Sequence, residues 1–159
     1  LSILGDKLSH TENERGEKDE DVIYRKKYYS ILQVKDYLLS KKLAEKCGAL
    51  KKPVFIIYFY SNKGDCDDCT KEGYVLTRLK EKYPELRVYS FDYDLDLSVI
   101  DSLKAIFRIK AAPLPALVIE DKTYTGFKSV EELEALLPDT LKEATIATST
   151  TATTSKKSK

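Results

Sequence analysis

The chain contains 159 residues, of which 42% are hydrophobic and 33% are charged, and its formal net charge is +1. This length predicts one ordinary domain with additional segments at its ends. A net charge so close to zero argues against nucleic acid as a partner, and no apolar run approaches the roughly 20 residues of a membrane-spanning helix.

The N-terminal part divides into two segments. Residues 1–21 are polar, mostly acidic and without a helical repeat, and they predict a flexible leader. Residues 22–50 predict an amphipathic basic helix. The apolar stripe that we expect to be buried contains Tyr28, Ile31, Leu32, Leu38, Leu39, Leu43 and Cys47, and the basic face contains Arg25, Lys26, Lys27, Lys35, Lys41, Lys42 and Lys46.

The basic face of this helix has two interpretations. One is a solvated face of a packed helix, and the other is a docking surface for an acidic partner or anionic lipid. The acidic leader offers an intramolecular partner, which favours the solvated face. At the end of the stripe, Cys47 is interpreted as a small buried apolar residue and not as a reactive thiol.

Residues 54–60 form a continuous apolar run, which predicts a strand buried on both faces of a sheet covered by helices. A second strand is expected at residues 86–91. Asp92, Asp94 and Asp96 follow it. We interpret them as residues that form the turn and cap at the end of the strand. A calcium-binding loop is disfavoured, because the glycine and the distal glutamate of such a loop are missing.

A C-x-x-C motif, Cys66 and Cys69, lies between these strands, and helical spacing follows it from Tyr74 to Tyr83, where Pro84 ends the pattern. The first turn of a helix has free N–H groups and the positive end of the macrodipole, and both favour a thiolate. Cysteines three residues apart in one helical turn are able to close a disulfide. The motif therefore predicts thiol–disulfide exchange.

Two capping boxes predict helices further along the chain. Ser98 with Asp101 opens a short helix, and Ser129 with Glu132 opens the last one, which Pro138 ends.

Between these helices, residues 111–115 include two prolines and are unable to continue a helix. Residues 116–119 and 123–127 predict an antiparallel hairpin. Thr, Ala, Ser and Lys dominate residues 139–159, which predict a disordered tail.

The order of these elements resembles the thioredoxin fold over residues 51–138. Three features carry the resemblance: the C-x-x-C at a strand–helix junction, Pro115 immediately before the next-to-last strand, and the closing hairpin with its helix. The resemblance implies an α/β fold with a mixed four-stranded sheet flanked by helices. The helix at residues 22–50 is then an N-terminal extension that replaces or precedes the usual opening strand.

The resemblance also implies roles for individual residues. Cys66 is then the exposed catalytic nucleophile and Cys69 the resolving thiol, and the two form a disulfide. The Leu114–Pro115 peptide bond is expected to be cis and to lie against that disulfide as part of the substrate-binding surface. No cofactor and no metal are implied.

The motif departs from the W-C-G-P-C of thioredoxin, because it lacks the Trp and the Pro, and thioredoxin's buried acid falls at Tyr58. Asp65, Asp67 and Asp68 surround the cysteines instead. We expect these charges to raise the pKa of Cys66 against the effect of the helix, which predicts a reducing or slow couple. The same aspartates also suit stabilisation of the helix start or selection of a basic partner.

The favoured function is a thiol–disulfide oxidoreductase acting on protein thiols and disulfides. The alternative is a non-catalytic interaction module whose cysteine pair is structural or vestigial. A zinc site is disfavoured, because only Cys47 and His10 remain to join the motif. The lack of Met indicates an excised or processed chain. The sequence leaves two compartments open, the cytoplasm or an anchored extracytoplasmic domain, and membrane anchoring would require residues absent from this sequence.

Overall fold

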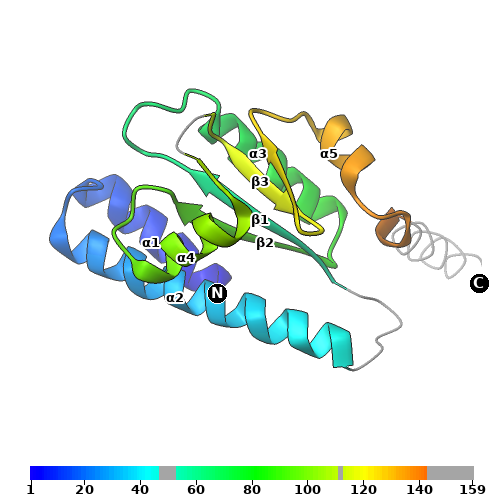
Figure 1. Ribbon diagram of the computed structural model, residues 1–159. Helices are drawn as coiled ribbons and strands as arrows, with labels where there is room; N and C mark the ends of the chain where they lie inside the picture. Colours follow the sequence, from blue (N-terminus) through cyan, green and yellow to red (C-terminus); the bar gives the residue numbers. More distant parts are fainter. Residues whose placement is uncertain (47–52, 111–112, 143–159) are drawn as a thin grey trace, which may run out of the picture.

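The computed structural model describes residues 1–46, 53–110 and 113–142, and a four-stranded mixed sheet forms its centre (Figure 1). The strand order is β2-β1-β3-β4; β1 runs parallel to β2 and antiparallel to β3, and β3 and β4 form an antiparallel hairpin. The strands are β1 (Val54–Tyr60), β2 (Leu86–Asp92), β3 (Ala116–Ile119) and β4 (Lys122–Thr125). The mixed sheet expected from the sequence is confirmed.

Helices cover both faces of this sheet. They are α1 (Ser2–Arg15), α2 (Glu20–Lys46), α3 (Cys69–Lys82), α4 (Ser98–Phe107) and α5 (Val130–Leu136). Because side chains alternate along a strand, Ile56 and Tyr58 of β1 pack in a core with residues of α3 and α5. Ile57 and Phe59 pack in a second core with residues of α2 and α4. The two cores explain why the whole run of β1 is apolar.

Residues 1–21, expected to be a flexible leader, instead contain helix α1 and the start of α2. Gly16, at a φ of 86°, ends α1, and the Asp19 carboxylate accepts hydrogen bonds from the N–H groups of Asp21 and Val22 at the start of α2. Polar contacts rather than a continuous apolar stripe hold α1 on the protein, which is why the periodicity did not reveal it.

The buried side of α2 also differs from the expected stripe. Tyr28, Leu38, Leu39 and Leu43 are exposed, and the buried residues are Val22, Lys26, Ser30, Gln33, Val34 and Tyr37. Cys47, the last member of the expected stripe, lies outside the described residues. Half of the buried set is polar because α2 lies against β2, whose free edge and terminal carboxylate need polar partners.

Gln33 makes this edge contact directly. Its side-chain amide donates to the carbonyl of Ser90 at 2.9 Å and accepts from the N–H of the same residue at 3.0 Å. The side chain thereby forms both hydrogen bonds that a neighbouring strand would offer at this position. In the part of the chain that the structure describes, no strand precedes β1, so α2 occupies this side of the sheet.

Lys26 is a second polar anchor, with an exposed fraction of only 5%. Its ammonium donates to Glu12 of α1 at 2.6 Å and to Asp92 at the end of β2 at 3.0 Å. Burial by itself lowers the pKa of Lys26, but the bonds and charges of the two carboxylates outweigh burial and raise it. This lysine, expected on the solvated basic face, therefore joins α1, α2 and the sheet.

Two smaller expectations were wrong and one was confirmed. Leu97, not Ser98, is the N-cap of α4, and no side chain caps it. The tail does not begin at residue 139, because Leu141 is 3% exposed and belongs to the core beneath α5; residues 143–159 lie outside the described part. The capping box of Ser129 and Glu132 is present with both hydrogen bonds.

We expect Lys26→Met to lower the free energy of unfolding by about 3–5 kcal/mol, because it leaves the buried carboxylate of Asp92 and the half-buried carboxylate of Glu12 without their cation. Urea-induced unfolding measures the change. Lys35→Met, at an exposed position of the same helix, is the matched control and should change stability by less than about 0.5 kcal/mol. Equal losses in the two variants would contradict a stabilising role for the buried contact.

Candidate functional site

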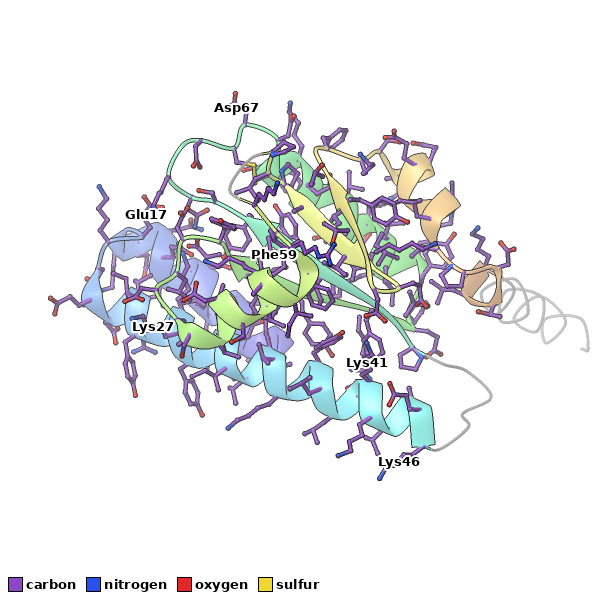
Figure 2. All side chains as sticks on the ribbon, in the orientation of Figure 1. Glu17, Lys27, Lys41, Lys46, Phe59 and Asp67 are labelled. Carbon is purple, nitrogen blue, oxygen red and sulfur yellow. A yellow bond between two sulfur atoms is a disulfide. The ribbon has the colours of Figure 1, made fainter. Side chains whose placement is uncertain are left out.

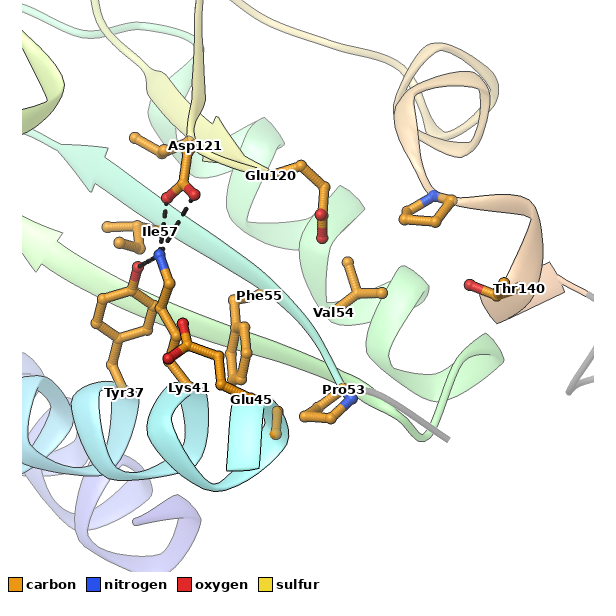
Figure 3. Close-up of a pocket in the computed structure, with 13 residues that line it drawn as sticks. Tyr37, Lys41, Glu45, Pro53, Val54, Phe55, Ile57, Glu120, Asp121 and Thr140 are labelled. Carbon is orange, nitrogen blue, oxygen red and sulfur yellow. Dashed lines mark hydrogen bonds and ion pairs between the residues drawn. The ribbon is translucent and has the colours of Figure 1, made fainter. Parts of the chain in front are cut away.

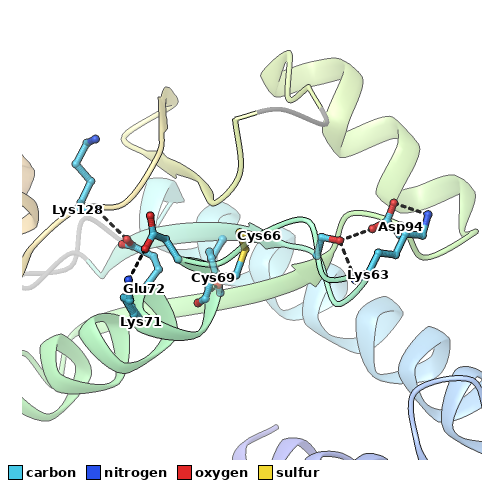
Figure 4. Close-up of a disulfide and its surroundings, with 10 residues drawn as sticks. Lys63, Cys66, Cys69, Lys71, Glu72, Asp94 and Lys128 are labelled. Carbon is cyan, nitrogen blue, oxygen red and sulfur yellow. Dashed lines mark hydrogen bonds and ion pairs between the residues drawn. A yellow bond between two sulfur atoms is a disulfide. The ribbon is translucent and has the colours of Figure 1, made fainter.

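The cysteine pair lies where the loop after β1 enters α3. Cys69 is the first residue of α3, and Cys66 lies three residues before it in the loop. A disulfide joins the two, and their Cα atoms are 5.4 Å apart (Figure 4). Cys69 is buried with 6% exposed, whereas Cys66 is only half-buried. Of the two sulfur-bearing residues, Cys66 is therefore the one that solvent reaches.

Pro115 lies at the same end of the sheet as the motif. The Leu114–Pro115 peptide bond is cis; Pro115 is fully buried and Leu114 is half-buried. Ala116 pairs with Phe59 near the end of β1, so Pro115 sits next to the point where the chain leaves β1 for the cysteines.

The three aspartates of the motif have different surroundings. Asp65 and Asp67 are exposed, and Figure 2 shows Asp67 projecting away from the protein body, in contrast to Phe59 inside it. Asp68 is the N-cap residue of α3, but its side chain forms no capping hydrogen bond. It forms an ion pair with Lys71 at 2.8 Å instead, and this bond raises the pKa of Lys71.

The loop before the cysteines is held by one acid that follows β2 and by one acid of α1. Asp94 accepts hydrogen bonds from the Ser61 hydroxyl at 2.6 Å and from the Lys63 ammonium at 2.8 Å. Burial by itself raises the pKa of Asp94, but these two donors outweigh it and lower the pKa. Glu12 of α1 accepts a further bond from the Asn62 amide at 3.1 Å. The loop is therefore fixed at both Ser61 and Asn62.

Beneath the disulfide lies a buried tyrosine. Tyr58 is 5% exposed, and its hydroxyl donates a 2.6 Å hydrogen bond to the carbonyl of Cys69. Burial, and then the nearby charge of Glu72, raise the pKa of Tyr58, so the hydroxyl stays protonated as a donor. A neutral hydroxyl group thus holds the first turn of α3 against β1.

Glu72 is the residue of this site that the sequence analysis missed. The helical spacing noted in the sequence begins at Tyr74, which is 73% exposed, whereas Glu72, outside that pattern, is 0% exposed. One carboxylate oxygen, Oε2, accepts the N–H of Lys128 at 2.8 Å. The other, Oε1, has no hydrogen-bond partner among the described residues. Spacing was the available signal, since Glu72 follows Cys69 by three and precedes Leu76 by four, on one helix face.

A cavity of about 290 Å³ opens at the other end of β1 (Figure 3). Tyr37, Phe55 and Val54 line it, and Lys41 crosses it to form an ion pair with Asp121 at 3.0 Å. This contact joins α2 to the turn of the β3–β4 hairpin. The cavity lies at the first residues of β1, whereas the cysteines follow the last residue of β1, so the cavity and the cysteine site are separate.

Within residues 1–46, 53–110 and 113–142, no three His, Cys, Asp or Glu side chains are grouped in a way that would hold a metal ion. His10 is exposed and lies 3.3 Å from Glu14. Among the helices of the same ranges, none has the length and apolar character to cross a membrane.

Comparison with known proteins gives structural neighbours only. No family model and no curated protein match the chain. A structure described as that of a malarial protein aligns with a TM-score of 0.44 and 23% identity, covering 53% of this chain and 92% of the other. Malarial thioredoxin-2, described as a component of the parasite's protein secretion machinery, aligns with a TM-score of 0.43 and 24% identity over 53% of this chain and 80% of the other.

The arrangement of this chain can be stated from its own strands and residues. The sequence resemblance depended on the C-x-x-C pair at the junction of β1 and α3, on Pro115 immediately before β3, and on the β3–β4 hairpin followed by α5, and all three are present. The sheet has the order β2-β1-β3-β4, and helices cover both of its faces. The chain therefore has a thioredoxin-like α/β fold with an N-terminal extension of two helices.

Proposed function

We propose that this chain is a thiol–disulfide oxidoreductase that exchanges disulfides with other proteins through Cys66 and Cys69. The observation that supports the proposal is the unequal exposure of the pair: Cys66 is half-buried and Cys69 is buried. Disulfide exchange needs one accessible sulfur to attack the substrate and a second, protected sulfur to release it.

In the proposed reaction, the Cys66 thiolate attacks one sulfur of a protein disulfide, forms a mixed disulfide and releases one substrate thiolate. Cys69 then attacks Cys66, which re-forms the intramolecular disulfide and releases the second substrate sulfur. Two electrons pass from this chain to the substrate, and a dithiol reductant restores the two thiols.

The other predicted site residues have supporting roles in this proposal. Leu114, which is half-buried, offers the surface on which the substrate backbone lies, and the buried Pro115 beside it fixes the position of that surface. Both residues adjoin the end of β1 from which the motif loop departs. The exposed carboxylates of Asp65 and Asp67 favour substrates with basic side chains near their disulfide. Asp68 contributes less to this preference for basic substrates, because its carboxylate forms an ion pair with the ammonium group of Lys71 at 2.8 Å.

Reduction of the disulfides of insulin by dithiothreitol, followed as turbidity, tests the proposal. The chain should accelerate the reaction, and Cys66→Ser should return it to the uncatalysed rate because the attacking sulfur is lost. Cys69→Ser should accumulate a mixed disulfide that resolves slowly.

The third cysteine provides the matched control: Cys47→Ser should retain the full rate. If Cys66→Ser is as fast as the unaltered chain, the pair has no catalytic role.

A second candidate function, an interaction module, is supported by the outward side of α2. Tyr24, Leu39 and Leu43 are 70%, 63% and 61% exposed, and exposed lysines Lys35, Lys42 and Lys46 lie among them. Figure 2 shows Lys46 pointing away from the sheet. Along the described part of α2 these three lysines form no ion pair, so the complementary occupant is an acidic protein surface with apolar contacts.

Binding of poly-L-glutamate, measured by fluorescence titration at low salt, tests this surface. We expect Lys35→Glu combined with Lys42→Glu to weaken binding by about tenfold or more, since two attractive charges become repulsive. The matched control reverses two exposed lysines elsewhere, Lys80→Glu with Lys122→Glu. Equal weakening by both pairs would assign the binding to overall charge and remove α2 as the docking surface.

A further inference from the structure

The buried carboxyl group of Glu72 is not explained by packing alone. Glu72 is 0% exposed, and its Oε1 lacks a hydrogen-bond partner in the described ranges. A buried polar atom without a partner destabilises the folded chain, and an apolar side chain of similar size at the same place would avoid this cost. The position therefore calls for a chemical role.

The surroundings of Glu72 place it at the buried side of the disulfide. Glu72 and Cys69 both belong to the buried face of α3, one turn apart, and Cβ atoms at this spacing lie roughly 5–6 Å from each other. Figure 4 shows the two side chains close to the N-terminal end of α3, where both residues belong to its first turn. The charge of Glu72 also acts on Tyr58, whose hydroxyl is bonded to the carbonyl of Cys69.

We propose that Glu72 is the proton acceptor for the Cys69 thiol in the resolving step of disulfide exchange, an inference that rests on the function proposed above. In the mixed disulfide, the Cys69 thiol gives its proton to Glu72 Oε1, directly or through one water. The Cys69 sulfur then bonds to Cys66, the bond from Cys66 to the substrate breaks, and the departing substrate thiolate takes the proton back.

The groups that face the Glu72 carboxylate are suited to this exchange. Burial raises the pKa of Glu72; the N–H and the charge of Lys128 lower it, and the charges of Glu132 and Asp68 raise it again, with a net rise. Tyr58 faces it from β1 and remains neutral. A carboxylate with a raised pKa is a stronger base than an exposed glutamate and is closer in pKa to a thiol, of about 8.5, which makes proton transfer more efficient.

The attack by Cys66 and the resolution by Cys69 can be measured as two separate phases. For this, a chain that carries Cys47→Ser is reduced and then mixed with the aromatic disulfide 5,5′-dithiobis(2-nitrobenzoate). Attack by Cys66 releases the first thionitrobenzoate, and resolution by Cys69 releases the second. We expect Glu72→Gln to slow the second phase by about 100-fold and to leave the first phase unchanged. The fall of the second rate at low pH, due to protonation of Glu72, should be lost in the variant.

Glu81→Gln, an exposed carboxylate of the same helix, is the matched control and should leave both phases unchanged. An unaltered second phase in Glu72→Gln, or equal slowing of both phases, would overturn the inference. These outcomes differ from failure of the proposed function, which would appear as absent reduction of insulin while both phases with the small aromatic disulfide persist.

Thermal unfolding shows whether the Glu72→Gln variant folds and whether ionisation of the buried carboxyl group lowers the stability of the unaltered chain. Because the pKa of Glu72 is raised in the folded chain, the unaltered chain loses stability as the pH rises from the unfolded-state pKa, about 4.3, through the folded-state pKa. The variant carries no charge there, so its melting temperature should exceed that of the unaltered chain by more at pH 8 than at pH 4. A difference that does not depend on pH would show that the buried group does not titrate, which would overturn its role as proton acceptor.

Discussion

The ammonium group of Lys26 is the contact on which the arrangement of the N-terminal helices depends. It lies between the carboxylates of Glu12 and Asp92, and so it holds two helices against the end of β2. Such a group is costly to bury, and it is tolerated because both of its anionic partners are partly buried with it. The specificity of this contact compensates for the weak apolar pattern of α1.

This contact continues toward the disulfide through neighbouring side chains. Asp92, besides bonding Lys26, accepts the N–H of Asp94 at 3.0 Å, and Asp94 in turn holds Ser61 and Lys63. Glu12 bonds both Lys26 and Asn62. The loop that presents Cys66 is therefore positioned by the same polar groups that attach the extension to the sheet.

The carboxylates near the cysteines fall into two classes with different physical effects. Asp65 and Asp67 are exposed, so water and salt weaken their influence on the sulfurs. Glu72 is removed from water, where the effective dielectric constant is lower and a single charge acts more strongly on its neighbours. A carboxylate charge on Glu72 therefore acts more strongly on the two cysteine sulfurs than the charges of Asp65 and Asp67, although Glu72 lies outside the C-x-x-C motif.

The sequence was sufficient for the features that depend on local signals. The apolar run of β1, the C-x-x-C at the start of α3 and the capping box at Ser129 each appeared where the pattern predicted them. The helix α1, the buried side of α2 and Glu72 were missed, because each depends on a polar partner far away in the chain. Lys26 and Asp92 are 66 residues apart, and Glu72 and Lys128 are 56 apart, so no periodicity within one helix reveals these pairs.

The double hydrogen bond between Gln33 and Ser90 has a consequence for self-association. An open outer strand is a template on which another chain can add by backbone pairing and begin a fibril. In this molecule the long outer strand β2 is blocked there by a side chain of α2, and the opposite outer strand, β4, is only four residues long. Removal of the N-terminal helices would therefore leave a sheet prone to polymerise, even with the cysteines intact.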